Sequence, residues 1–201
     1  MKHGITRDSK KVPDALVGTA ASAAVTPLAA ATTTVNPAGV VQYASKYWQQ
    51  WNPYYKGLPD DDCTDFASQA LFAGGWTMVH TGNYNQPDQW WYSDGGGVAP
   101  AQQSYPWENA QQLADFGGHY SPRFYADVAT PKWKAGDIAF WIWDQTTTFK
   151  YNHTTIVTYV DSSGSPYFTQ HSANHYNQAY SAYIVANPHA YVADMHLRTS
   201  Y

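Results

Sequence analysis

The sequence predicts an α+β domain in which helices come first and an antiparallel sheet follows. Two observations carry this prediction. Between residues 36 and 115, apolar residues recur at the three- and four-residue spacing of amphipathic helices. After Ala135 the pattern changes to continuous apolar runs and β-branched runs, which are typical of strands. Turn-forming residues separate these runs, and no segment of the sequence repeats another.

Three helices are expected in the first half. The first spans about 36–51 and ends before Asn52-Pro53, because the residue before a proline avoids the helical conformation. The second follows Cys63 and ends at Gly74-Gly75, since glycine adopts the left-handed C-terminal conformation at little cost. The third spans about 106–115. Residues 77–104 are rich in turn formers and predict a long surface excursion, anchored in its middle by aromatic residues.

Five strands are expected in the second half, over residues 138–143, 154–160, 166–170, 180–185 and 191–197. The first is a continuous apolar run, which indicates a strand buried on both faces. The turn Asp161-Ser162-Ser163-Gly164 joins the second and third into a hairpin.

Residues 1–35 are expected to lie outside the fold as a signal peptide or disordered leader, leaving one domain over 36–201. A basic start precedes a run of small, uncharged residues between 15 and 31, as in export signals. Asp8 and Asp14 interrupt the basic part, so an unstructured Ala/Thr-rich tail is the alternative. A secreted, extracellular protein is the location that we expect.

Composition excludes several classes of protein. Charged residues are 13% and aromatic residues 16% of the chain, which argues against disorder. The net charge is −4 with no run of Lys or Arg, so nucleic acid is not an expected partner. No segment is apolar enough to predict a membrane span. The many Trp and Tyr residues predict either aromatic surfaces that face sugars or peptides, or ordinary core packing.

Cys63, the one cysteine in 201 residues, is the candidate nucleophile. It lies at a predicted helix N-terminus, where the partial positive charge lowers a thiol pKa and favours the thiolate. An exported protein with an odd cysteine has a free thiol. A small buried hydrophobe is the alternative role for a lone cysteine.

Two histidines are candidates for its partners. His153 opens one strand of the predicted hairpin and His171 closes the other. If the turn has three residues, His171 lies opposite Thr155, on the same face as His153 and one diagonal step away. A two-residue turn would move His171 to the other face. Asn174 and His175 follow closely and compete with His171 for this role.

A metal site at His171 and His175 is not expected, because no carboxylate or second cysteine lies near them in the sequence to complete zinc ligation. The sequence indicates neither a metal nor a cofactor.

The motif Asp62-Cys63-Thr64-Asp65-Phe66-Ala67-Ser68-Gln69-Ala70-Leu71, followed by Gly74-Gly75, resembles the amidase domain of secreted bacterial proteins. That family is similar to the NlpC-type and CHAP-type papain-like cysteine hydrolases. The resemblance extends over about residues 40–197. Its further matches are Tyr43-Ala44, Tyr47-Trp48, Asn52-Pro53-Tyr54, Trp91-Tyr92, Ser104, Trp107, Gly136-Asp137-Ile138, His153-Thr154-Thr155-Ile156-Val157 and Gln170-His171-Ser172.

The resemblance implies a papain-like, NlpC-type α+β fold with Cys63 as the nucleophile and His153 as the general base. It implies His171 as the residue that orients His153, since related folds place His, Asn or Gln on the following strand. The sequence departs from the family at Asp65, where Asn is usual. A carboxylate there would either raise the thiol pKa by repulsion or cap the helix.

The function predicted from these residues is a secreted, monomeric, cysteine-dependent amidase or peptidase acting on peptidoglycan or peptides. Asp62, Trp90 and Trp91 are the candidates for contacting substrate, with core anchoring as the alternative role of the tryptophans. A non-catalytic module that binds cell walls or proteins through exposed aromatic residues is the rival function. An acyltransferase built on the same site is a third.

Overall fold

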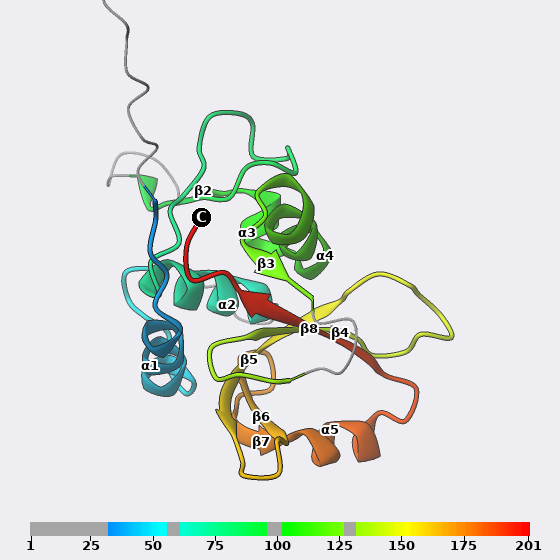
Figure 1. Cartoon of the computed structure of the whole chain (residues 1–201). Helices are drawn as coiled ribbons and strands as arrows, with labels where there is room; N and C mark the ends of the chain where they lie inside the picture. Colours follow the sequence, from blue (N-terminus) through cyan, green and yellow to red (C-terminus); the bar gives the residue numbers. More distant parts are fainter. Residues whose placement is uncertain (1–31, 56–60, 96–101, 127–131) are drawn as a thin grey trace, which may run out of the picture. The chain divides into compact units, whose positions relative to one another are not determined.

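The computed structural model describes residues 32–55, 61–95, 102–126 and 132–201 (Figure 1). The compact unit begins at Thr32, four residues before the predicted start of the domain. Residues 32–35 belong to it because they pair with the chain end: the Thr33 N–H donates to the Tyr201 carbonyl at 2.9 Å, and Val35 is buried. The predicted leader, residues 1–31, lies outside the described residues.

The structure confirms the α+β class, with helices packed on an antiparallel sheet (Figure 1). The helices are α1 (Pro37–Tyr47), α2 (Cys63–Ala73), α3 (Tyr105–Glu108), α4 (Ala110–Asp115), the π-helical turn η2 (Phe116–Tyr120) and α5 (Tyr180–Ala186). The strands are β1 (Tyr92–Ser93), β2 (Gln102–Gln103), β3 (Phe124–Tyr125), β4 (Ile138–Ile142), β5 (His153–Val160), β6 (Pro166–Gln170), β7 (His175–Ala179) and β8 (Tyr191–Leu197). Within the described residues, no helix has the length and apolar content needed to cross a membrane.

The first two helices form where the sequence predicts them. At the start of α1 the Asn36 side chain accepts a hydrogen bond from the Ala38 N–H at 3.1 Å. This helix ends at Tyr47, earlier than expected. The second helix, α2, starts at Cys63, and Gly75 follows its end with φ +103°, a conformation that favours glycine.

The third predicted helix is interrupted at Asn109. This residue has extended backbone angles, and its side chain caps α4 by accepting a hydrogen bond from the Gln112 N–H at 3.1 Å. Beyond α4 the chain continues through Gly117 and Gly118 as η2. A Cβ on Gly117 would lie 2.2 Å from the Phe124 ring, so this glycine permits the close contact between η2 and β3.

The six-stranded sheet has the order β3-β8-β4-β5-β6-β7, and every neighbouring pair is antiparallel. All five residues of β4 are buried, as its continuous apolar run predicts. Ile138 and Phe140 pack into the core under α1, α2 and α4. Ala139 and Trp141 pack on the opposite face, against α5. The sheet is therefore a central layer with helices on both sides (Figure 1).

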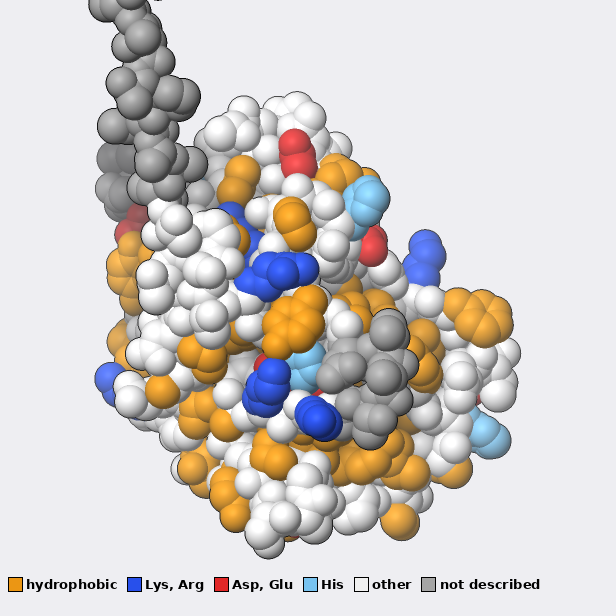
Figure 2. All heavy atoms as spheres, in the orientation of Figure 1, with side chains coloured by type: hydrophobic (Ala, Val, Ile, Leu, Met, Phe, Trp, Pro, Cys, Tyr) orange, Lys and Arg blue, Asp and Glu red, His pale blue; other side chains and the backbone are white. Residues whose placement is uncertain are grey.

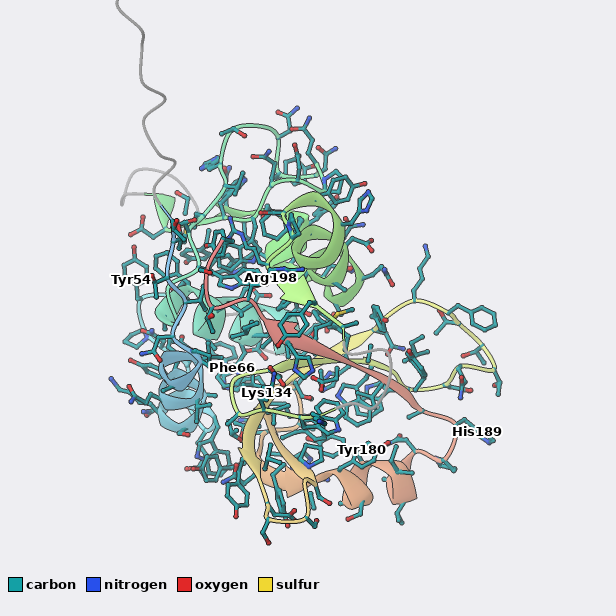
Figure 3. The ribbon with its side chains drawn as sticks, viewed as in Figure 1. Tyr54, Phe66, Lys134, Tyr180, His189 and Arg198 are labelled. Atoms are coloured by element: carbon teal, nitrogen blue, oxygen red, sulfur yellow. The ribbon has the colours of Figure 1, made fainter. Side chains whose placement is uncertain are left out.

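Residues 180–185, predicted as a strand, form the helix α5 instead. Tyr180, Tyr183 and Ile184 have helical spacing and pack together on the sheet face that carries Trp141 and Phe168. The β-branched residues favoured a strand in the sequence, but burial of this apolar stripe requires the helix. Tyr180, labelled in Figure 3, lies at the beginning of this helix.

Candidate functional site

The β5–β6 hairpin has two registers, and the change between them decides which side chains meet. Near the turn the predicted register holds: the Asp161 N–H donates to the Ser165 carbonyl at 3.0 Å, and Val160 pairs with Pro166. Thr158 is then an extra residue on β5, and beyond it Val157 pairs with Phe168. This bulge shifts the pairing by one residue.

The bulge changes the partner of His153. Continued from the printed pairs, the shifted register places Gln170 opposite Thr155, one diagonal step from His153. The hydrogen bond agrees, since His153 Nε2 lies 3.0 Å from Gln170 Oε1. The expectation that His171 orients His153 is therefore wrong in its geometry, because a one-residue slip exchanges the side chains on the two faces.

The surroundings of Gln170 fix its amide orientation. Its Nε2 donates to the backbone carbonyls of Ser172 and Ala173, at 3.2 and 3.1 Å. Its Oε1 therefore faces His153, and it also accepts the Tyr183 hydroxyl at 2.7 Å. Both carbonyls belong to a turn in which Ser172 and Ala173 have positive φ values of 59° and 73°.

This orientation also fixes the tautomer of His153. Because Gln170 Oε1 can only accept, His153 Nε2 must carry the hydrogen, and the lone pair of the neutral ring lies on Nδ1. Burial lowers the pKa of His153 to about 4, against the opposing effects of the Gln170 bond and the charge of Asp61. The ring is thus a neutral base at physiological pH.

Cys63 lies at the first position of α2 and is buried. Its thiol receives hydrogen bonds from Thr64 and from the backbone of Thr154, the residue that follows His153. The hydroxyls of Thr64 and Thr154 lie 3.0 Å apart and join the two elements at this point. The structure thus brings the start of α2 to the start of β5, although the described residues form no hydrogen bond between the Cys63 thiol and the His153 ring.

The thiol pKa differs from the prediction. Burial raises the pKa of Cys63 above its ordinary value, and the charge of Asp61 raises it further. The hydrogen bonds from Thr64 and Thr154 lower the pKa but do not outweigh burial. The prediction of a lowered pKa considered the helix terminus and omitted the cost of placing a thiolate in a buried position.

His171 bonds to Asp62 instead of His153. Its Nδ1 lies 2.6 Å from Asp62 Oδ2, and its Nε2 lies 2.7 Å from the Tyr47 carbonyl. The carbonyl can only accept, so Nε2 carries a hydrogen, and one proton is shared between Nδ1 and the carboxyl group. The ring also stacks on Phe66, 4.0 Å between centroids. His171 therefore holds the end of α1, the start of α2 and the end of β6 together.

This arrangement leaves the start of α2 without a side-chain cap. Asp62 occupies the capping position, but its carboxyl group is turned toward His171 and Ser172 and makes no cap hydrogen bond. The first N–H groups of a helix have no acceptor within the helix, and that of Cys63 is the first. Asp62, predicted to contact substrate, is buried and instead positions this helix start.

A cavity of about 570 Å³ opens beside the hairpin. His153 and Gln170 line it, together with Trp143 and Tyr183, and Asp61 lies at its edge toward α2. The Trp143 ring lies 5.0 Å from the His153 ring, between centroids. The catalytic candidate His153 therefore faces a space large enough for part of a substrate.

Residues 34–193 match the family described as "Putative amidase domain". The chain belongs to this family. "Uncharacterized protein YhbB" of Bacillus subtilis (strain 168) is 32% identical over 130 residues, which cover 64% of this chain and 38% of that protein. The chain thus spans well under half the length of this curated relative. No solved structure matches the chain. Membership of an amidase family indicates hydrolysis of amide bonds.

Asp65, the departure from the usual family residue, lies in the first turn of α2 and is buried. Burial raises its pKa well above the ordinary value, as do the charges of Glu108 and Asp62, while a bond from Gln103 opposes this. Asp65 neither caps the helix nor is among the groups that raise the pKa of Cys63. Its neighbours are the carboxylate and amide groups of α3 and β2.

The two tryptophans predicted to contact substrate have different positions. Trp90 is fully buried in the core, where its Nε1 donates to Ser68 Oγ at 3.1 Å, so it does not reach substrate. Trp91 is 3% exposed, stacks on His80 and lines a second cavity beside α3. Sequence alone could not separate these neighbours, because both are apolar aromatics in one loop.

A second buried group of titratable residues lies away from Cys63. Asp137, Asp194 and His196 place their ligand atoms within 4.8 Å of one another, and His196 Nδ1 is 2.7 Å from Asp137. The His196 ring lies 4.9 Å from the Tyr125 ring, between centroids. Figure 2 shows a face of the molecule on which basic side chains gather around an aromatic ring. Lys134 and Arg198, labelled in Figure 3, both lie over the Tyr125 ring.

Proposed function

We propose that this protein is a cysteine-dependent amidase in which Cys63 is the nucleophile and His153 the general base. One observation carries the proposal: the amide of Gln170 holds His153 as its Nε2–H tautomer, which leaves Nδ1 as the basic nitrogen at the start of β5. An imidazole with one nitrogen bonded to a fixed acceptor and the other carrying the lone pair is the arrangement that a nucleophile–base pair requires.

The pair starts in its neutral form. The pKa of Cys63 is raised and that of His153 is lowered, so thiol and imidazole coexist at neutral pH. In the attack, the thiol proton moves to His153 Nδ1 while Sγ bonds the amide carbonyl carbon. The imidazolium then protonates the leaving amine, and a thioester remains on Cys63. Water, deprotonated by the same nitrogen, hydrolyses the thioester to a carboxylic acid and restores the thiol.

The start of α2 provides electrostatic stabilisation of the tetrahedral intermediate. The N–H of Cys63, at the uncapped N-terminus of α2, is positioned to donate to the oxyanion of the tetrahedral intermediate. The site thus combines a base from the start of β5 with a nucleophile and an N–H donor, both from the start of α2.

The fold that we propose is the papain-like, NlpC type, with His153 on one strand and Gln170 on the next as its polar pair. The substrate class that we propose is the amide bond of peptides or of peptidoglycan, and the place of action is outside the cell. The family membership, the mixed aromatic and polar cavity beside His153, and the lone thiol support this proposal.

Substitution of Cys63 tests the proposal. The full chain is incubated with peptidoglycan sacculi and with a casein digest, and new amino groups are measured. We expect Cys63→Ala and His153→Ala to abolish amine release, while both variants keep the thermal unfolding of the parent. His175→Ala is the matched control, because this histidine lines the same cavity and pairs with Gln170 through the strand register, while its ring forms no hydrogen bond to the side chains of His153 or Gln170 among the described residues; it is expected to retain activity. Amine release by the Cys63→Ala variant would refute the proposal.

A further inference from the structure

Three cavities follow one another along the surface, starting at His153. The cavity beside His153 shares Asp61 with a second cavity of about 560 Å³ at α3. That second cavity shares Tyr105 and Glu108 with a third, of about 600 Å³. The third is also lined by Trp91, His80 and Tyr84. The shared lining residues make the three cavities neighbours along one path.

The walls of this path carry negative charge. Asp61 and Glu108 each line two of the three cavities, and the described lining residues include no lysine or arginine. Basic side chains gather elsewhere, with Lys134 and Arg198 over Tyr125 beside β3 and β8 (Figure 2). The path is therefore negatively charged and repels anions.

A buried carboxyl group adjoins the lining of the third cavity. Asp65 is 4% exposed, and its Oδ2 has no hydrogen-bond partner among the described residues. The Asp65 carboxyl group interacts with Gln103 and Glu108, both of which line the third cavity, and Gln103 Nε2 donates to Glu108 Oε2 at 2.7 Å. Burial raises the pKa of Asp65, and repulsion from the charges of Glu108 and Asp62 raises it further. A bound cation at Glu108 would relieve that repulsion.

Aromatic rings complete the third cavity. Tyr84 and Tyr105 are 52% and 41% exposed and meet edge to face, 5.3 Å between centroids. Exposed aromatic faces beside a carboxylate attract ammonium groups and cover the aliphatic stem that carries them. Trp91 lines the same cavity, is buried, and has an indole N–H without a hydrogen-bond partner among the described residues. This N–H can donate to a carbonyl or hydroxyl oxygen of a ligand.

We propose that the three cavities form one substrate groove and that this groove selects peptide chains bearing primary ammonium side chains, with Asp61 and Glu108 as the specificity-determining residues. The catalytic consequence rests on the proposed function, whereas binding of the cationic chain does not. Asp61 receives the ammonium group nearest the scissile amide, and Glu108 with the two tyrosines receives the next.

Asp61 acts on both members of the catalytic pair, because its charge raises the pKa of both Cys63 and His153. An ammonium group that neutralises Asp61 removes the repulsion from the developing thiolate and also the attraction that favours the imidazolium, so the two effects on the proton transfer oppose each other. A cationic substrate is therefore expected to gain through binding, in KM and in kcat/KM.

Matched peptides test the groove. We compare a lysine-containing hexapeptide library with the same library in which every lysine is Nε-acetylated, so that only the charge differs. Binding to the full-length Cys63→Ala variant is measured by calorimetry, and hydrolysis by the parent protein is measured as amine release. We expect the lysine peptides to bind and to react at least about fivefold better, an advantage that declines as salt is added.

Variants locate the effect. Asp61→Asn and Glu108→Gln are each expected to reduce the lysine advantage, and together to abolish it. Asp161→Asn, which removes the same charge at the distant hairpin turn, preserves it. Equal binding of both libraries by the Cys63→Ala variant overturns the groove, whatever the parent hydrolyses. Selective binding that Asp61→Asn and Glu108→Gln abolish, in a parent that hydrolyses nothing, supports the groove and refutes the proposed function alone.

Discussion

Replacement of His153 by Gln should change how the stability of the fold depends on pH. In the folded protein burial lowers the pKa of His153 to about 4, against 6.5 for an ordinary histidine. Between these two values the unfolded chain binds a proton that the folded chain does not, so the free energy of unfolding rises with pH. The difference corresponds to about 3 kcal/mol, fully present above pH 6.5 and lost as the pH falls toward 4.

Urea unfolding of both proteins, at pH values between 4 and 7, measures this term. Other groups titrate in the same range, and Asp65, with its raised pKa, acts in the opposite direction. They are present in both proteins, so the difference between parent and His153→Gln isolates the histidine. We expect the parent to gain about 3 kcal/mol relative to the variant as the pH rises from 4 to 6.5.

Identical pH dependence in the two proteins would refute the reasoning, because it would mean that His153 titrates in the fold as it does in the unfolded chain. A slope of the opposite sign would indicate a charged imidazole, stabilised by an ionised partner. The second result would also remove the neutral thiol–imidazole pair from the proposed mechanism.

Three further substitutions have distinct expected outcomes. Gln170→Ala should lower kcat by about 100-fold or more in an amine-release assay, because it frees the tautomer and orientation of the catalytic base, while Gln178→Ala in the same cavity should not. His171→Phe should preserve ring stacking but destabilise the fold by about 3 kcal/mol in urea, since the buried Asp62 carboxyl group loses its partner. If His171→Phe instead lowered kcat as much as Gln170→Ala does, without loss of stability, His171 would again be the residue that orients His153. Gly117→Ala should cost about 1–3 kcal/mol through contact with Phe124, whereas Gly118→Ala, with nothing within 4 Å, should be near neutral by thermal unfolding.

Much of the architecture could be predicted because the signals are local. The cysteine helix, its glycine end and the buried strand β4 are each set by residues adjacent in sequence, and they lie where the pattern indicates. The helix α5 could not be predicted in this way. Its β-branched residues favour a strand, and only the apolar face of Trp141 and Phe168 beneath it makes the helical stripe the better way to bury Tyr183.

The candidate site also contains features that local sequence could predict and features that it could not. Cys63 and His153 could be chosen from sequence because their residue types and element positions are local properties. The pairing of His153 with Gln170 could not, because it depends on one extra residue at Thr158, whose side chain is held by Thr169 and Asn177 from the two following strands. The raised pKa of Cys63 likewise comes from burial by distant segments, which the helix terminus alone does not reveal.

The bulge at Thr158 has a consequence for protein engineering. It separates the hairpin into an outer part, whose alignment is set by the turn after Asp161, and an inner part, whose alignment is set by contacts across the sheet. Lengthening the exposed turn should therefore leave the inner alignment intact. A fluorescent reporter or an affinity tag inserted between Ser162 and Ser163 would then sit on the same hairpin as His153 without displacing Gln170 from its ring.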